Sequence, residues 1–195
     1  MTGVSTKLTD DSDRTLIERC QAGHDVAFEE LVRRHQARAV NVAWRLLGNR
    51  EDAIEVAQDA FVRIYRKLDG FRGECEFTTW LHQIVVNLAH NKHRWWNRRG
   101  RSKTETLTGD RQIAAPTDSP DTVAVQNEYG RKLSARMATL PVDYREVLVL
   151  RSVEDLSYDE IAAVLQCSLG TVKSRIARAR EALRDSMNDE ELSKH

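Results

Sequence analysis

Hydrophobic residues recur along this chain at the spacing of α-helices from Asp13 onward. Apolar positions at i, i+3, i+4 and i+7 lie on one face of a helix, and successive segments show this pattern. The segments are 13–21, 27–46, 51–68 and about 77–96. Asp13 is expected to cap the first helix, while Gly23 ends it and Gly48 with Asn49 ends the second. Runs of β-branched residues are few and no Asn-Gly hairpin signal occurs, so the pattern predicts an all-α protein.

The same periodicity predicts the buried face of each helix. In the third segment, the predicted core residues are Ile54, Ala57, Phe61, Ile64, Tyr65 and Leu68. The opposite face of that helix carries Asp52, Glu55, Gln58, Asp59, Arg63 and Arg66. In the fourth segment, the predicted apolar stripe consists of Phe77, Trp80, Leu81, Ile84, Val85 and Leu88. We expect these helices to form a compact bundle over residues 13–99, after a disordered segment at residues 1–12.

After residue 99 the apolar periodicity disappears, and Gly, Ser, Thr, Asp and Pro dominate. This composition is typical of a flexible linker, which we place at residues 100–121. Helical periodicity then returns, and Pro141 is expected at the first position of a further helix. The predicted core side of that helix consists of Val147, Leu148, Leu150 and Val153. A second small domain is therefore predicted over residues 122–185, followed by an acidic tail at 186–195.

Residues 157–184 have the pattern of two helices joined by a tight turn. Ser157 and Glu160 form a capping box, a turn is expected at 166–168, and the second helix begins near Leu169. Basic side chains follow on that helix at Lys173, Arg175, Arg178, Arg180 and Arg184. Small residues at its N-terminal end permit close approach to base edges, which favours a DNA-binding helix-turn-helix over a hairpin with a solvated basic face. Lys173 and Arg178 are the expected base-edge donors, and Arg175 or Arg180 the expected phosphate contacts.

Charge is segregated along the chain although the formal net charge is zero. Basic residues gather at 92–103 and 173–184, and acidic residues at 51–59, 154–160 and 185–191. A phosphate backbone responds to the local field within about 10 Å, so segregation matters more than the sum. The stretch from 77 to 103 contains no Asp or Glu, which indicates a surface for an anion. The acidic face of segment 51–68 suggests that a protein partner binds the side of this unit opposite to the basic surface.

Two features of the acid-free stretch point to nucleic acid. Asn87 follows Trp80 by seven residues, so its amide lies at the edge of the apolar stripe. There it could read the Watson-Crick edge of an unstacked base or make a hydrogen bond at the core edge, and the sequence leaves both open. Trp95 and Trp96 point about 100° apart on a helix, so one face cannot bury both. At least one is expected to cover apolar surface or to stack on nucleic acid.

Other classes of site find little support. Cys20, Cys75 and Cys167 are far apart, which indicates neither a disulfide framework nor a thiolate metal site. His90 and His93 are spaced i, i+3, but no carboxylate or thiol accompanies them in the sequence, so no metal site or cofactor is predicted. No nucleophile-base pair or phosphate-binding Gly loop occurs, so neither catalysis nor a small-molecule substrate is expected. Without an apolar run of about 18 residues or a signal peptide, we expect a cytoplasmic protein.

The chain resembles the extracytoplasmic-function (ECF) sigma factors, a class of the sigma-70 family of bacterial transcription initiation factors. The resemblance runs from Asp13 to Arg184. Its motifs are LIERCQAGHDVAFEELV, EDAIEVAQDAFVRIYRKLDGFRG, FTTWLHQIVVNLAHN and LSYDEIAAVLQCSLGTVKSRIARAREAL. It implies two helical domains, called regions 2 and 4, joined by a linker. It further implies core RNA polymerase, promoter DNA and an anti-sigma factor as partners.

The resemblance also implies roles for individual residues. Region 2 is expected to bind the clamp helices of polymerase through Asp52, Glu55, Gln58, Asp59 and Arg63. It is expected to melt and read the −10 element through Trp80, Asn87, Asn91, Lys92, Arg94, Arg98 and Arg99. Region 4 is expected to read the −35 element through Thr171, Lys173, Ser174, Arg175, Ala177 and Arg178. Alternatives are a stand-alone dimeric helix-turn-helix regulator and a helical adaptor without a role on DNA.

Overall fold

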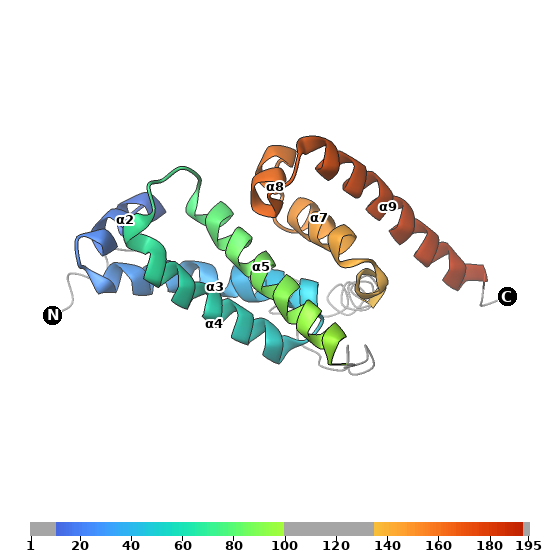
Figure 1. Ribbon diagram of the computed structural model, residues 1–195, viewed down its shortest axis with the longest axis horizontal. Helices are drawn as coiled ribbons and strands as arrows, with labels where there is room; N and C mark the ends of the chain where they lie inside the picture. The colour runs from blue at the N-terminus through green and yellow to red at the C-terminus, as the bar shows by residue number, and fades with distance from the viewer. Residues whose placement is uncertain (1–10, 100–134, 193–195) are drawn as a thin grey trace, which may run out of the picture.

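A computed structural model describes residues 11–99 and 135–192, and of residues 188–192 only the backbone (Figure 1). The first part contains α2 (Asp13–Gln21), α3 (Asp25–Leu47), α4 (Arg50–Lys67), a short 3₁₀ turn (Leu68–Gly70) and α5 (Phe77–Arg98). The second contains α7 (Val142–Ser152), α8 (Tyr158–Leu165) and α9 (Leu169–Leu192). No strand occurs in these two ranges, so the all-α prediction is confirmed. The expected linker at 100–121, residues 1–10 and the end of the acidic tail lie outside the described residues.

Polar side chains cap the starts of α2, α4 and α8. Ser12, not Asp13, caps α2, since its hydroxyl accepts a hydrogen bond from the Thr15 amide at 3.2 Å. Asp13 lies instead in the first turn, where its carboxylate is 2.8 Å from the His35 ring. Gly48 ends α3 in the left-handed conformation with φ of 73°, as glycine allows at this position. Helices α2 to α5 pack against one another and form the N-terminal bundle, residues 13–99.

The core of the N-terminal bundle lies between α3, α4 and α5. Leu31, Ile64 and Leu81 are fully buried there. The predicted burial of Ile54 and Tyr65 is wrong, because both side chains are exposed, Tyr65 by 50%. The buried stripe of α4 is centred one position away and consists of Ala53, Val56, Ala57, Ala60, Phe61 and Ile64. The alanines in this stripe let the three helices approach closely, while Phe61 and Ile64 fill the core between them.

The C-terminal unit, residues 135–192, contains the predicted helix-turn-helix. The capping box of Ser157 and Glu160 is present, with both hydrogen bonds formed at 3.2 and 2.7 Å. Gln166 makes the turn in the left-handed conformation, and α9 begins at Leu169 as expected. Pro141 precedes α7 as its N-cap, one position earlier than predicted. Val153 is exposed rather than in the core, because α7 ends at Ser152.

Buried polar contacts join the N-terminal bundle to the C-terminal unit. Helix α3 packs against α7, and α5 packs against α8 (Figure 1). The guanidinium of Arg145 is buried and donates to the carbonyl oxygens of Leu46 in the bundle and of Met137 in its own unit. The carboxylate of Glu154 accepts a hydrogen bond from Arg38 and lies 3.0 Å from Nε2 of His82. The two parts therefore meet through paired charges as well as apolar contacts.

Burial and pairing act on these charges in opposite directions. Desolvation by itself would raise the pKa of the Glu154 carboxyl, but the contacts with His82 and Arg38 outweigh it, so the pKa is lowered. Desolvation lowers the pKa of Arg145 against the attraction of Glu146. Removing one partner from such a buried pair is costly, because the remaining charge stays out of water.

In the described ranges, no helix is long and apolar enough to span a membrane.

Candidate nucleic-acid and protein interfaces

Helix α5 has three faces with different surroundings. One face carries Leu81, Val85 and Leu88 into the core of the N-terminal bundle. A second face carries the fully buried His82 toward the C-terminal unit. The third face is exposed and holds Asn87, Asn91, Arg94 and Arg98, spaced i, i+4, i+7 and i+11. The structure thus gathers four of the predicted −10 contacts into one polar, basic stripe.

Trp80 lies at the border between this stripe and the core. Its ring is partly buried and stacks on Phe71, with centroids 4.6 Å apart and an interplanar angle of 17°. Phe77 meets the same indole edge-on at 6.4 Å. The Asn87 side chain is exposed and has no hydrogen bond within the described residues, so it does not make the core-edge hydrogen bond that the sequence left open. Phe71 and Phe77 therefore hold the Trp80 ring in place, about two helical turns before Asn87 on α5.

The two remaining tryptophans have different surroundings at the end of α5. Trp96 packs against the hydrophobic core, and its ring lies 6.1 Å from that of His93. Trp95 lies under the guanidinium of Arg99, which is 4.3 Å from its ring centroid. Neither indole is fully buried, as the 100° offset predicts. The pair of Trp95 and Arg99 thus places a cation and an aromatic face together at the exposed end of the stripe.

Lys92 links the predicted −10 and polymerase contacts. Its ammonium lies 2.8 Å from Asp52 and 2.6 Å from Glu55 on α4. Burial would lower the pKa of Lys92, but the hydrogen bonds to these two carboxylates raise it. Lys92 is therefore engaged, and a contact with DNA requires that it leave this pair.

The outward face of α4 combines charged and apolar side chains. Glu55, Gln58, Asp59 and Arg63 are exposed there, as predicted for a protein-binding face, and Asp52 is partly exposed. Sequence reasoning missed the apolar part of this surface, which consists of Val26, Ile54, Val62 and Tyr65. Tyr65 donates a hydrogen bond to Asp25 at 3.0 Å, which joins the two helices that carry the patch. Exposed apolar residues beside charges are typical of a protein interface.

Helix α9 exposes most of the predicted −35 contacts. Lys173, Ser174, Ala177 and Arg178 are exposed. The side chain of Thr171 is 2.8 Å from Ser168, whose hydroxyl also caps α9 by accepting from the Thr171 amide. Arg175 differs, because its guanidinium is paired with Asp143 on α7 at 2.7 Å. Sequence reasoning missed this pair, along with the contact of Glu154 with His82, since the partners are distant in the chain.

Comparisons with known proteins agree with this geometry. Residues 31–100 match the family model for sigma-70 region 2, and residues 130–183 match that for sigma-70 region 4. The RNA polymerase sigma-H factor of Pseudomonas aeruginosa is 38% identical over 182 residues, covering 90% of this chain and 94% of the relative. The ECF RNA polymerase sigma-E factor of Escherichia coli K12 is 36% identical over 185 residues, covering 92% of this chain and 95% of the relative.

Solved structures show the same fold. CnrH, solved in complex with the cytosolic domain of CnrY, has a TM-score of 0.68 at 28% identity, covering 92% of this chain and 99% of CnrH. The sigma factor RpoE of Bartonella quintana, solved with the anti-sigma factor NepR, has a TM-score of 0.64 at 23% identity, covering 83% of this chain and 96% of RpoE. The two family matches and the relatives identify a two-domain transcription initiation factor. This chain belongs to the sigma-70 family and, within it, to the ECF sigma factors.

Proposed function

We propose that this chain binds core RNA polymerase, directs it to promoters by reading −35 and −10 elements, and assists promoter melting. The observation that carries the proposal is the division of α5, which anchors in the bundle on one side and exposes a polar, basic stripe on another. Exposed basic residues on α9 provide a second DNA surface, and α4 a mixed surface for a protein. Such a factor acts in the cytoplasm and neither catalyses a reaction nor requires a cofactor.

The −10 element is read in this proposal by the exposed stripe of α5. Arg94 and Arg98 contact phosphates, while Asn87 pairs with the edge of a base that has left the stack. The ring of Trp80, held by Phe71, supports the melted strand beside that base. Stacking of a base on an aromatic side chain contributes about 1 to 3 kcal/mol. Arg99 and Trp95 hold the adjoining backbone.

The −35 element is read by the N-terminal half of α9. Lys173 and Arg178 donate to base edges in the major groove, while Thr171 and Ser174 approach the backbone. Ala177 is small enough to let the helix approach the bases. Arg175 has a different role, because its pair with Asp143 orients it toward α7. It supports the position of α9 and contacts phosphate only if the pair opens.

Polymerase binding uses the outward face of α4. Ile54, Val62 and Tyr65 supply apolar area, and Asp59 and Arg63 supply charges that fix orientation. We propose that an anti-sigma factor covers the same face, because exposed apolar residues need a cover when polymerase is absent. The complexes solved for CnrH and for the Bartonella RpoE are consistent with such a partner.

Transcription with purified components tests the proposal. Core polymerase supplemented with the full chain is expected to start transcripts from a defined set of fragments of genomic DNA, whereas core alone does not. Starts that share no upstream sequence, or no starts at all, would contradict the proposal. Tight binding of the chain alone to a palindrome would instead identify a stand-alone dimeric regulator. A protein that binds neither polymerase nor DNA would be a helical adaptor.

A further inference from the structure

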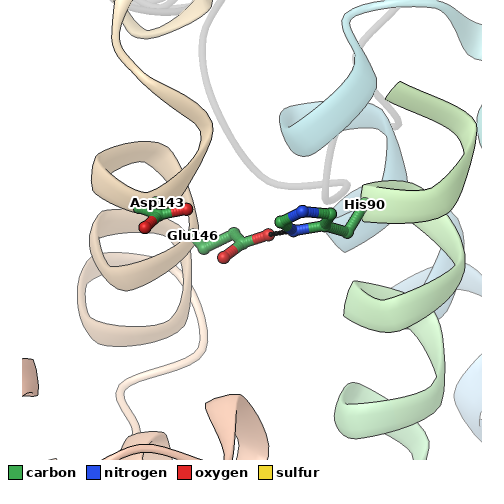
Figure 2. A group of neighbouring side chains, drawn as sticks. All are labelled: His90, Asp143 and Glu146. Atoms are coloured by element: carbon green, nitrogen blue, oxygen red, sulfur yellow. Dashed lines mark hydrogen bonds and ion pairs between the residues drawn. The ribbon is translucent and has the colours of Figure 1, made fainter. Parts of the chain in front are cut away.

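His90, Asp143 and Glu146 meet between the N-terminal bundle and the C-terminal unit. Figure 2 shows Glu146 extending from α7 toward the ring of His90 on α5, with Asp143 one turn earlier on α7. One ligand atom from each residue lies within 4.8 Å of the other two. Nδ1 of His90 and Oε1 of Glu146 are 3.1 Å apart. The sequence around His90 contains no carboxylate, so this group exists only because α5 and α7 lie side by side.

Glu146 is a buried charge with incomplete pairing. Its side chain is 5% exposed, and desolvation raises its pKa while the contact with His90 lowers it. A carboxylate accepts about four hydrogen bonds, but His90 is the only hydrogen-bond partner of Glu146 in the described ranges. Burying a carboxylate without full compensation costs free energy. The second oxygen of Glu146 has no hydrogen bond in the described ranges, so it can accept a ligand.

Asp143 is held in place by a partner outside the group. Its Oδ2 accepts from Arg175 at 2.7 Å, which leaves its other oxygen free of that contact. Side chains that coordinate metals are commonly oriented by such outer hydrogen bonds. The two carboxylates lie near two cations, because Arg175 pairs with Asp143 and Arg145 attracts Glu146. The guanidinium of Arg145 donates to backbone carbonyls, however, so a divalent cation would give Glu146 a direct contact that Arg145 does not.

We propose that His90, Asp143 and Glu146 bind a divalent first-row transition metal ion of the Zn²⁺ type. Imidazole nitrogen with two carboxylate oxygens is a ligand set that suits Zn²⁺ or Co²⁺, and soft ions prefer thiolates. Ligands about 2.0 to 2.2 Å from a tetrahedral ion lie roughly 3.5 Å apart, so small rotations of Asp143 and Glu146 close the site. The fourth position takes water. Because the ligands come from both parts of the chain, the ion fastens the C-terminal unit to the bundle.

This inference goes beyond promoter recognition, since none of the three ligands is among the proposed polymerase or DNA contacts. Its consequence is a link between metal occupancy and the docked arrangement. A ligand that binds only the folded, docked form stabilises it in proportion to the logarithm of the ligand concentration over Kd. Zn²⁺ is therefore expected to raise the midpoint of thermal unfolding of the full chain.

Titration of the metal-free full chain with Co²⁺ tests the site. The expected result is one equivalent bound, with visible absorption of a four-coordinate ion that Zn²⁺ displaces. His90→Ala and Glu146→Gln are expected to weaken binding at least tenfold. His24→Ala is the matched control, because His24 is exposed and makes no side-chain cap at the start of α3. That variant should bind Co²⁺ as the parent does.

Two further measurements keep the outcome decisive. Circular dichroism shows whether each variant is folded. If Glu146→Gln does not fold, the result for His90→Ala decides, because the side chain of His90 is 41% exposed and tolerates truncation. Zn²⁺ should raise the thermal midpoint of the parent and of His24→Ala, but not of folded His90→Ala. Absence of Co²⁺ absorption, or absorption and thermal shift that persist in His90→Ala, would overturn the proposal. These metal-binding experiments do not measure transcription, so a negative result would leave the proposed function intact.

Discussion

The Nε2 atom of His82 lies 3.0 Å from the carboxylate of Glu154, although the two residues belong to different parts of the chain. The imidazole is fully buried, and the Glu154 side chain is 4% exposed. Arg38 on α3 completes this group by donating to the same oxygen of Glu154. The buried His82 on α5 therefore contacts the C-terminal unit, although the exposed face of the same helix is the proposed DNA surface.

Replacement of Glu154 by Ala is expected to destabilise the docked arrangement. It leaves Arg38 and the buried His82 without their shared acceptor, at a cost of about 2 kcal/mol. Denaturant unfolding should show the loss, and small-angle X-ray scattering should show a larger radius of gyration. The matched control is Asp155→Asn, because Asp155 is 93% exposed and Asn tolerates its φ of 52°. Equal effects of the two variants would contradict a specific role for Glu154.

Replacement of Asn87 by Ala is expected to slow promoter opening while core binding persists. The exposed amide makes no hydrogen bond within the described residues, so the change is expected to remove an interaction with DNA and to leave the bundle intact. A loss of roughly tenfold in opening corresponds to about 1.4 kcal/mol. Fluorescence of a 2-aminopurine in the −10 element measures opening, with Gln36→Ala on the exposed part of α3 as control. Reduced affinity for core polymerase would show instead that Asn87 supports the fold.

Arg178 and Arg175 are expected to respond differently to truncation, although both lie on the recognition helix. Arg178→Ala should cost about 1 to 3 kcal/mol at one −35 position and relax sequence preference there. Arg175→Ala breaks the pair with Asp143 and should lower stability slightly, with little change in preference. Transcription from a panel of −35 variants distinguishes the two effects. A uniform loss on all sequences would make Arg178 a phosphate contact.

Lys92 is expected to couple polymerase binding to DNA binding. Basic residues of a partner that take Asp52 and Glu55 would release the Lys92 ammonium toward the promoter. Lys92→Met should therefore weaken promoter binding by the holoenzyme without lowering affinity for core. Lys67→Met, an exposed change at the end of α4, serves as control. A marked loss of core affinity in Lys92→Met would show that the pair only positions α4 against α5.

Acid is expected to weaken the N-terminal bundle through Glu30. The hydrogen bond from Arg33, helped by Arg34, outweighs desolvation and lowers the pKa of Glu30 to about 2. A carboxyl whose folded pKa is depressed stabilises the fold above its unfolded pKa of about 4.3, and the contribution is lost as pH falls toward 2. As pH is lowered across that interval, the free energy of unfolding should fall less steeply in Glu30→Gln than in the parent. The exposed Glu29→Gln should follow the parent, and identical slopes in all three proteins would contradict the prediction.

Local patterns in the sequence determined the helices and the helix-turn-helix. The capping box of Ser157 and Glu160 involves residues three apart, so the sequence contains the whole interaction. Gly48 ends α3 for the same local reason. The exposed stripe that includes Asn87 follows from helical periodicity once the buried face is known. Periodicity failed at Ile54 and Tyr65, because α4 has more apolar residues than one buried face can hold, and the packing buried the face that carries Ala53, Val56 and Ala60 instead.

Only the tertiary structure decided which charged side chains are paired. Lys92 and Arg175 look like free DNA contacts in the sequence, but each lies against an acidic partner from another helix. His82 and His90 likewise gain Glu154 and Glu146 from the C-terminal unit. These pairings depend on how α5 and α9 pack against other helices, and helical spacing carries no information about contacts between distant segments. The sequence alone therefore determined the elements and their exposed faces, and the packing determined which of their charges are already bound.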